Sequence, residues 1–176
     1  MLEKKVKTVG FPISHKENEN RRAIVPAHLK KIEHPELLYF EKEYGAVLGF
    51  EDSEYEACGS HIASHRDVLS KEIICDPKIG DADYLSELDH QTIFGWIHAT
   101  QNRDITDKLL QNGLTAFAWE KCFKKDVTFF GATMSLQVRR QSCMRFSVLQ
   151  ECLMKQRSQL SVEETRHVVL LRFLTC

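Results

Sequence analysis

The chain has 176 residues, of which 43% are hydrophobic and 28% charged, and its formal net charge is -1. This length allows one domain with its own core, or one domain with an appendage. The near-neutral charge argues against nucleic acid or an anionic membrane as a partner, and no apolar run approaches the roughly 20 residues of a transmembrane helix.

The amino terminus, MLEKKVKTVGF, has no long apolar segment after its lysines, so a cytoplasmic protein is expected. The six cysteines have neither the CxxC nor the Cys/His spacing of a zinc site, which predicts free thiols in a reducing compartment. His61 and His65, in the segment HIASH, have the spacing of a metal-binding pair on one helix face. No third ligand accompanies them, which favours two surface histidines and no metal site.

Short apolar runs alternate with helical patterns along most of the chain. Strands are expected at 6–11, 37–40, around 62, 73–75, 92–97 and 114–118, with an antiparallel addition at 127–130. Helices are expected at 26–32, from a cap at Asp52 or Ser53 to Gly59, around 65–69, at 81–88 and at 100–112. Strands separated by helices predict an α/β fold with a parallel, flavodoxin-like sheet flanked by helices.

The composition changes after Gly131. All eight glycines and all four prolines lie at or before that residue, and none occurs among the 40 residues from Gln137 to Cys176. An α/β domain of this kind rarely continues so far without a turn residue. The change predicts either a helical C-terminal tail or a stretch that is not the natural continuation of the domain.

The segment Gly10–Pro26, GFPISHKENENRRAIVP, follows the first expected strand and ends at a proline that can open a helix. Loops in this position of an α/β domain often carry ligand-binding groups. Further along the chain come YGAVLGFEDSEYEACG, ICDPK, FGWIHA, and AWE followed by GATMS.

On these motifs, residues 6–134 resemble the N-terminal domain of the alanine dehydrogenase and pyridine nucleotide transhydrogenase family. KENENRRAIVP is the most specific of them, because the family's opening loop has a glutamate, a spacer and an arginine before an apolar stretch ending in proline. Within the family the chain looks most like the opine-forming N5-(carboxyethyl)ornithine synthases and less like the saccharopine dehydrogenases.

The resemblance implies that this domain holds the substrates and that a second, Rossmann-type domain holds the cofactor, NADP(H). It implies an NADPH-dependent reductive condensation of pyruvate with the side-chain amine of ornithine, in a full-length enzyme that forms a homo-oligomer. Two alternatives stay open: a fragment resembling alanine dehydrogenase, and a binding module for an oxo acid or amino acid without catalysis.

Arg21 occupies the family's arginine position, where the resemblance implies that it binds the carboxylate of the oxo acid. A planar guanidinium suits this role because it pairs with two carboxylate oxygens at once. Arg22 is the fallback, since one twist of the loop exchanges the two side chains. In the alternative interpretation, Arg21 pairs with Glu17 or Glu19 in a solvated loop.

His98, in FGWIHA, matches the family's histidine, which the resemblance implies is a general acid/base on the carbonyl or hydroxyl group. Imidazole exchanges protons near neutral pH, which suits this role; the alternative is a histidine that caps the strand end. Lys78 is a second candidate for binding substrate, although the family's lysine precedes the proline of its motif and Lys78 follows Pro77. Glu17 and Glu120 are expected to position these cations.

No GxGxxG motif or variant occurs in the chain, so no cofactor is expected to bind it and it is expected to be inactive alone. The run Leu153–Phe173, back-translated and read one base earlier, can encode PYEAKVAVIGRGNTARGAFKI, an apolar strand followed by a nucleotide-binding turn. The segment from Gln137 similarly yields GEAAVMHAF. The hypothesis is a frameshift near Leu136, with a substrate domain at 1–136 and out-of-frame residues at 137–176; the alternative is a genuine dimerising helix.

Overall fold

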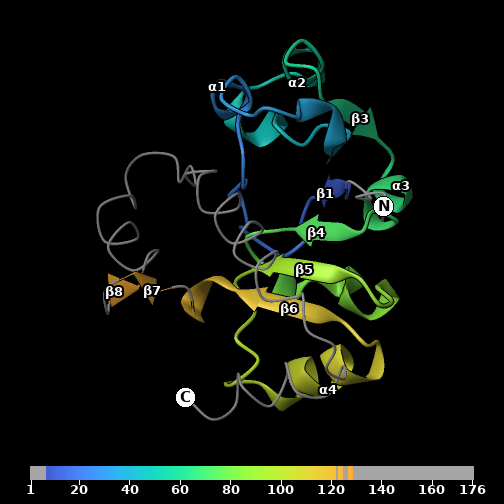
Figure 1. The fold of residues 1–176 in the computed structure, drawn as a ribbon, viewed down its shortest axis with the longest axis vertical. Coiled ribbons are helices and arrows are strands. Elements are labelled where there is room, and N and C mark those ends of the chain that lie inside the picture. The colour runs from blue at the N-terminus through green and yellow to red at the C-terminus, as the bar shows by residue number, and fades with distance from the viewer. Residues whose placement is uncertain (1–6, 122, 125–126, 129–176) are drawn as a thin grey trace, which may run out of the picture. The chain divides into compact units, whose positions relative to one another are not determined.

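The computed structural model describes residues 7–121, 123–124 and 127–128. Its centre is a six-stranded sheet in the order β3-β2-β1-β4-β5-β6, with every neighbouring pair parallel (Figure 1). The strands are β1 (Val9–Phe11), β2 (Leu38–Glu41), β3 (His61–Ala63), β4 (Ile73–Cys75), β5 (Thr92–Gly95) and β6 (Thr115–Ala118). The predicted α/β class, a parallel sheet flanked by helices, is confirmed.

The antiparallel pair predicted near residue 127 exists, but as a separate hairpin of β7 (Phe123–Lys124) and β8 (Val127–Thr128) rather than as an addition to the sheet. The predicted tail at 137–176 lies outside the described residues.

Most of the helices are shorter than the sequence pattern predicts. They are α1 (Pro26–Leu29), α2 (Asp52–Glu56), α3 (His65–Leu69) and α4 (Arg103–Gln111), joined by the 3-10 turns η1 (Pro35–Leu37), η2 (Ala46–Leu48), η3 (Ile79–Asp81), η4 (Asp83–Glu87) and η5 (Trp119–Lys121). The helix predicted at 26–32 ends early because the Lys31 N–H bonds to the His28 carbonyl, three residues back, and closes a tight turn. The helix predicted at 81–88 is two 3-10 turns separated by Ala82, whose ψ of 138° is extended.

The start of α2 also differs from the prediction. Its N-cap is Glu51, whose N–H donates to the Glu54 carboxylate at 3.0 Å, and not Asp52 or Ser53. The Asp52 carboxylate accepts instead from the backbone N–H of Glu43, at 2.9 Å. Because an acidic side chain can close the cap from either position, the sequence alone does not distinguish the two starts.

Two apolar groups fill the core. Aromatic rings gather between β1, β2 and α2, where Phe11 stacks on Phe40 with 4.6 Å between centroids. An aliphatic cluster joins Ile74 of β4 and Ile93 of β5 to Ile105 of α4. Helix α3 packs directly on β1. The two backbones are so close that a Cβ atom on Gly10 would come within 2.3 Å of the Val68 carbonyl oxygen.

The two histidines of HIASH do not share a helix face; His61 is exposed and His65 is partly exposed. His61 lies in β3 with its ring stacked on Tyr39, whereas His65 begins α3 and its Nδ1 lies 2.8 Å from a Glu41 oxygen. Among the described residues no group of three or more His, Cys, Asp or Glu side chains could hold a metal ion.

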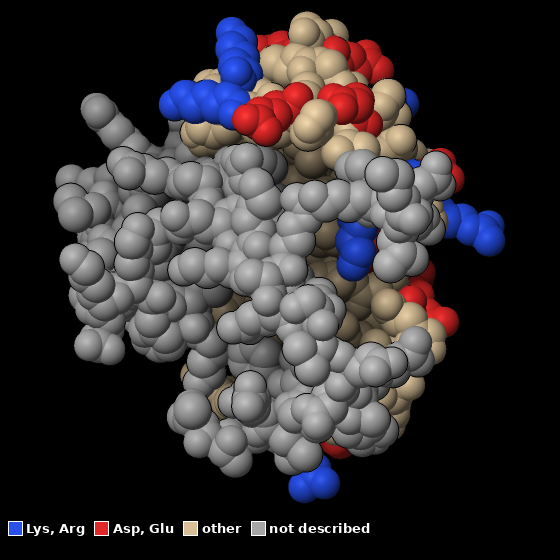
Figure 2. All heavy atoms as spheres, in the orientation of Figure 1, with Lys and Arg blue, Asp and Glu red and all other residues tan. Residues whose placement is uncertain are grey.

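The described surface mixes both signs of charge. In Figure 2, Lys and Arg side chains beside α1 lie close to Asp and Glu side chains over α2. A helix long and apolar enough to cross a bilayer does not occur in the described part of the chain.

Candidate functional site

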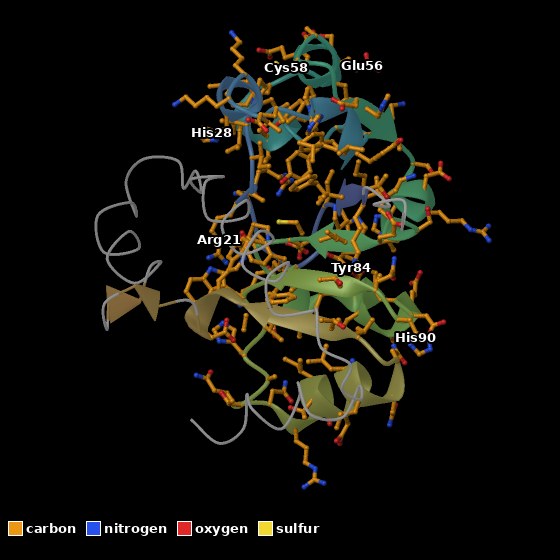
Figure 3. All side chains as sticks on the ribbon, viewed as in Figure 1. Arg21, His28, Glu56, Cys58, Tyr84 and His90 are labelled. Carbon is orange, nitrogen blue, oxygen red and sulfur yellow. The ribbon has the colours of Figure 1, made fainter. Side chains whose placement is uncertain are left out.

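The candidate site lies where β1, β4 and β5 end. These strands are neighbours and parallel, so their carboxyl ends meet at one edge of the sheet. The chain builds the sheet outward from β1 to β3 on one side and from β4 to β6 on the other. The β1/β4 boundary is therefore a topological switch point, where doubly wound sheets bind ligands. Figure 3 places Arg21 at this end of the sheet.

Arg21 forms a two-pronged ion pair with Glu19. Its Nε and Nη2 donate to the two carboxylate oxygens at 2.8 and 2.5 Å. This pairing raises the pKa of Arg21. Burial tends to raise the pKa of Glu19, but the hydrogen bonds and charge of Arg21 outweigh burial and leave that pKa lowered. Arg21 therefore pairs with Glu19, as the alternative interpretation of the sequence predicts. The predicted solvated loop is not what surrounds the pair, because the Glu19 side chain is only 7% exposed. Glu17 is exposed.

Arg22 points away from solvent and anchors the loop. Its Nε donates to the Tyr44 carbonyl at 2.6 Å, and its guanidinium lies over the Tyr44 ring. The Tyr44 hydroxyl accepts the Ala23 N–H at 2.8 Å. Arg22 is buried, so Arg21 is the arginine of the two that a ligand can reach.

A buried carboxyl group, Asp76, follows β4. It is 1% exposed, and it accepts hydrogen bonds from the Tyr84 hydroxyl and from the Lys78 N–H, the latter at 2.9 Å. Burial raises the pKa of Asp76 to about 6, although both hydrogen bonds oppose the shift. The charge of Asp76 in turn helps to raise the pKa of Arg21, so the two groups are close.

The sequence did not identify Asp76 or its partner Tyr84 as site residues. A signal for Asp76 exists, because an aspartate directly after the buried strand IIC stands at the ligand-binding edge of a parallel sheet. Tyr84 has no comparable signal, since its contact with Asp76 depends on the 3-10 turns between them.

Lys78 belongs to the same group of charges as Arg21. Its Nζ donates to Asp81 at 2.8 Å, and its charge contributes to the lowered pKa of Glu19, the partner of Arg21. Lys16, from the loop after β1, donates to the same Asp81 oxygen at 2.6 Å. The hydrogen bonds from Lys16 and Lys78 lower the pKa of Asp81 to about 2. The two predicted cations, Arg21 and Lys78, thus both act on Glu19: Arg21 by direct hydrogen bonds and Lys78 through its charge.

His98 lies at the same edge, on the loop after β5. Its backbone is left-handed, with φ of 57°, and its N–H donates to Glu120 at 2.6 Å. The second Glu120 oxygen accepts the Ile97 N–H at 3.3 Å. The Glu120 carboxylate therefore stabilises the turn by accepting two of its backbone N–H groups. The imidazole stacks on Trp96, with 6.0 Å between ring centroids.

Backbone contact joins the loops after β4 and β5. The Gly80 N–H donates to the Trp96 carbonyl at 3.1 Å. A Cβ atom on Gly80 would come within 2.0 Å of the Ile97 carbonyl oxygen. Lys78 and His98 therefore lie on two loops that hold each other in place. A carboxylate beside an electrophilic carbonyl could be bound from one loop while a proton is exchanged from the other.

Comparisons with known proteins identify relatives of this chain. The family described as "Alanine dehydrogenase/PNT, N-terminal domain" matches residues 10–130. Alanine dehydrogenase 1 of Staphylococcus aureus (strain Mu50 / ATCC 700699) is 25% identical over 133 residues, which cover 73% of this chain and 35% of that protein. The match thus spans about a third of the relative's length.

Two solved structures share the fold. An L-alanine dehydrogenase, 26% identical, superposes with a TM-score of 0.55 over 64% of this chain and 32% of its own. A transhydrogenase from Sinorhizobium meliloti, 22% identical, superposes with a TM-score of 0.56 over 65% of this chain and 34% of its own.

Proposed function

Because the chain belongs to the alanine dehydrogenase/PNT N-terminal domain family, we propose that residues 1–136 are the substrate-binding part of an NAD(P)H-dependent oxidoreductase and bind a 2-oxo acid. One observation carries this proposal: at the edge where parallel strands end, Arg21 lies near the buried Asp76, Lys78 donates its backbone N–H to Asp76, and the charges of both cations lower the pKa of Glu19. Two cations in such a place suit a small ligand with a carboxylate.

In this proposal the guanidinium of Arg21 binds the carboxylate and the ammonium of Lys78 gives a second positive charge. His98 exchanges a proton with the carbonyl oxygen, or with the hydroxyl group that forms from it. Stacking on Trp96 and the Glu120 bonds limit how far the His98 ring can move. The cofactor supplies the hydride when bound, but the chain has no glycine-rich turn to hold it. NADP(H) would therefore be held by another domain.

The proposed reaction is an NADPH-dependent condensation of pyruvate with the side-chain amine of ornithine, by a cytoplasmic enzyme that forms a homo-oligomer when complete. The motifs KENENRRAIVP and FGWIHA support it. A second candidate is an alanine dehydrogenase-like reaction with ammonia, which the name of the S. aureus relative favours. A binding module without catalysis is a third, favoured by the missing nucleotide turn.

Arg21→Met is expected to weaken pyruvate binding by roughly 30-fold, because a charge-assisted, two-pronged interaction is lost. Isothermal titration of the 176-residue chain with pyruvate, with and without NADPH, measures this loss. Arg103→Met is the matched control, since Arg103 is 89% exposed on α4. Equal pyruvate affinities of the Arg21 variant and wild type would contradict the proposed function. Heat or turnover that requires NADPH would favour a complete enzyme over a binding module.

We also propose that residues 137–176 are out-of-frame translation after a frameshift near Leu136. The support is that Leu153–Phe173 can be recoded, one base earlier, into a strand followed by GRGNTARG, a turn that binds dinucleotides. Sequencing the gene tests this proposal. The expected result is that the codons beyond Leu136 encode GRGNTARG in the neighbouring frame. Codons that cannot encode this segment would contradict the frameshift.

A further inference from the structure

Two imidazole rings from distant parts of the chain lie side by side. His15 follows β1 and His65 follows β3, and because the sheet is parallel these strands end at the same edge. The ring centroids are 5.4 Å apart, with 30° between the ring planes. The spacing HIASH suggests a pair of His61 and His65, whereas the fold brings His65 to His15.

Each of the two rings has a carboxylate at its Nδ1 atom. His65 Nδ1 lies 2.8 Å from Glu41 Oε2, and His15 Nδ1 lies 3.3 Å from Asp83 Oδ2. A carboxylate in this position holds the ring proton on Nδ1, so the lone pair of the neutral ring is on Nε2. Neither Nε2 atom forms a hydrogen bond or an ion pair with a described residue. Both rings therefore offer a nitrogen that is suited to binding a metal ion.

The His65 ring is held in place by its surroundings. Its partner Glu41 is buried, and the same Glu41 oxygen also accepts the Ile13 N–H at 2.7 Å. The Tyr84 ring, labelled in Figure 3, lies edge-on to His65 with 5.6 Å between centroids. The side chains of His65 and His15 are 33% and 56% exposed, so an ion can reach both from solvent.

We propose that His15 and His65 bind one divalent transition-metal ion, such as Zn²⁺ or Ni²⁺, through their Nε2 atoms. Glu41 and Asp83 orient the rings from behind, which is the usual role of a carboxylate at a metal-binding histidine. Their negative charges also favour a cation between the rings. Lys16, the residue after His15, does not oppose the ion with a free charge, because it is paired with Asp81 at 2.6 Å.

The separation of the rings suits such an ion. Imidazole nitrogen binds Zn²⁺ at about 2.1 Å, so two rings on one tetrahedral ion have centroids roughly 5 Å apart. The 5.4 Å between His15 and His65 is close to this value. Imidazole favours zinc, nickel and copper, whereas Mg²⁺ and Ca²⁺ take oxygen ligands. Since no third His, Cys, Asp or Glu of the described residues joins the pair, water would complete the coordination of the ion.

A bound ion would join two segments that are far apart in the sequence. His15 lies in the loop after β1, which continues to Arg21, and His65 lies at the start of α3. The ion would thus fasten this loop to α3, and the chain is expected to unfold about 5 °C higher when Ni²⁺ is saturating.

Isothermal titration of Ni²⁺ into the 176-residue chain at pH 7.5, without a histidine tag, tests the site. His15→Gln and His65→Gln are each expected to weaken Ni²⁺ binding by about 30-fold, because one of two protein ligands is lost. Asp83→Asn keeps both rings and is expected to weaken it about tenfold. Ni²⁺ is paramagnetic, so the NMR signals of the His15 and His65 rings should broaden before those of the other histidines.

His90→Gln is the matched control. His90 is exposed and has a carboxylate neighbour, Asp89, at 3.6 Å, but its ring contacts no second imidazole among the described residues. Thermal unfolding without metal shows whether each variant is folded, and the NMR titration of wild type decides the question if a histidine variant is not.

Equal Ni²⁺ affinities in wild type and both histidine variants would overturn the site, and so would broadening that begins at other histidines or a chain that binds no Ni²⁺. Because the titrations contain no pyruvate, none of these outcomes bears on the proposed function.

Discussion

Asp76→Asn is expected to raise the free energy of unfolding by about 3 kcal/mol at pH 7.5 and by only about 1 kcal/mol at pH 4.5. Asp76 is buried, and its pKa rises from 3.8 to about 6 on folding. Between these values the folded state holds one more proton than the unfolded chain, so stability falls as pH rises through this range. Above pH 6 wild type keeps a buried charge that asparagine does not have.

Urea unfolding of both proteins at several pH values between 4.5 and 8 measures this difference. Asp89→Asn serves as the control, because Asp89 is 79% exposed, and its effect is expected to stay within about 0.5 kcal/mol at every pH. A difference between Asp76→Asn and wild type that does not change with pH would show that the carboxyl does not titrate in this range. A stabilised variant that binds pyruvate less well would indicate that the buried acid serves the site at the expense of stability.

Gly80→Ala is expected to lower the free energy of unfolding by about 3 kcal/mol, since the added Cβ has to displace a backbone carbonyl. The added Cβ would lie 2.0 Å from the Ile97 carbonyl oxygen, so the loops after β4 and β5 must separate. The His98 ring should move with its loop, and the NMR signals of His98 should shift in the folded variant.

Gly49→Ala is the matched control. Gly49 has φ of 82° but nothing within 4 Å of a Cβ atom, so alanine there introduces only backbone strain. That strain is about 1 kcal/mol. If urea unfolding gives the same loss for both variants, the close contact of the two loops does not contribute to stability as argued.

Local patterns were enough to predict most of the sheet and the places of the helices α1, α2, α3 and α4. The apolar run at 73–75 and the pattern at 65–69 coincide with β4 and α3, because each element is specified by its own residues. The segment 81–88 could not be predicted in the same way. Its backbone is broken by the extended Ala82, and Tyr84 turns inward to bond with Asp76. Tertiary contacts override helical propensity there.

The roles of the two arginines could not be separated from the sequence for a similar reason. Arg21 and Arg22 are adjacent and chemically identical, and only the position of Tyr44, on a distant part of the chain, decides which is buried. The burial of Asp76 likewise depends on packing, since an aspartate before a proline more often marks an exposed turn. The sequence pointed to these loops but not to which of the two arginines is buried in them.

Arg22 fastens the loop after β1 to Tyr44 before any ligand arrives. In the proposed function, the loop that carries Arg21 is therefore held in place before binding, and little backbone freedom remains to be lost on association. Capture of an oxo acid should then be a single-step encounter, accelerated by low salt, rather than a slow two-step process. Even a three-carbon acid, which makes few contacts, could bind to so rigid a receptor.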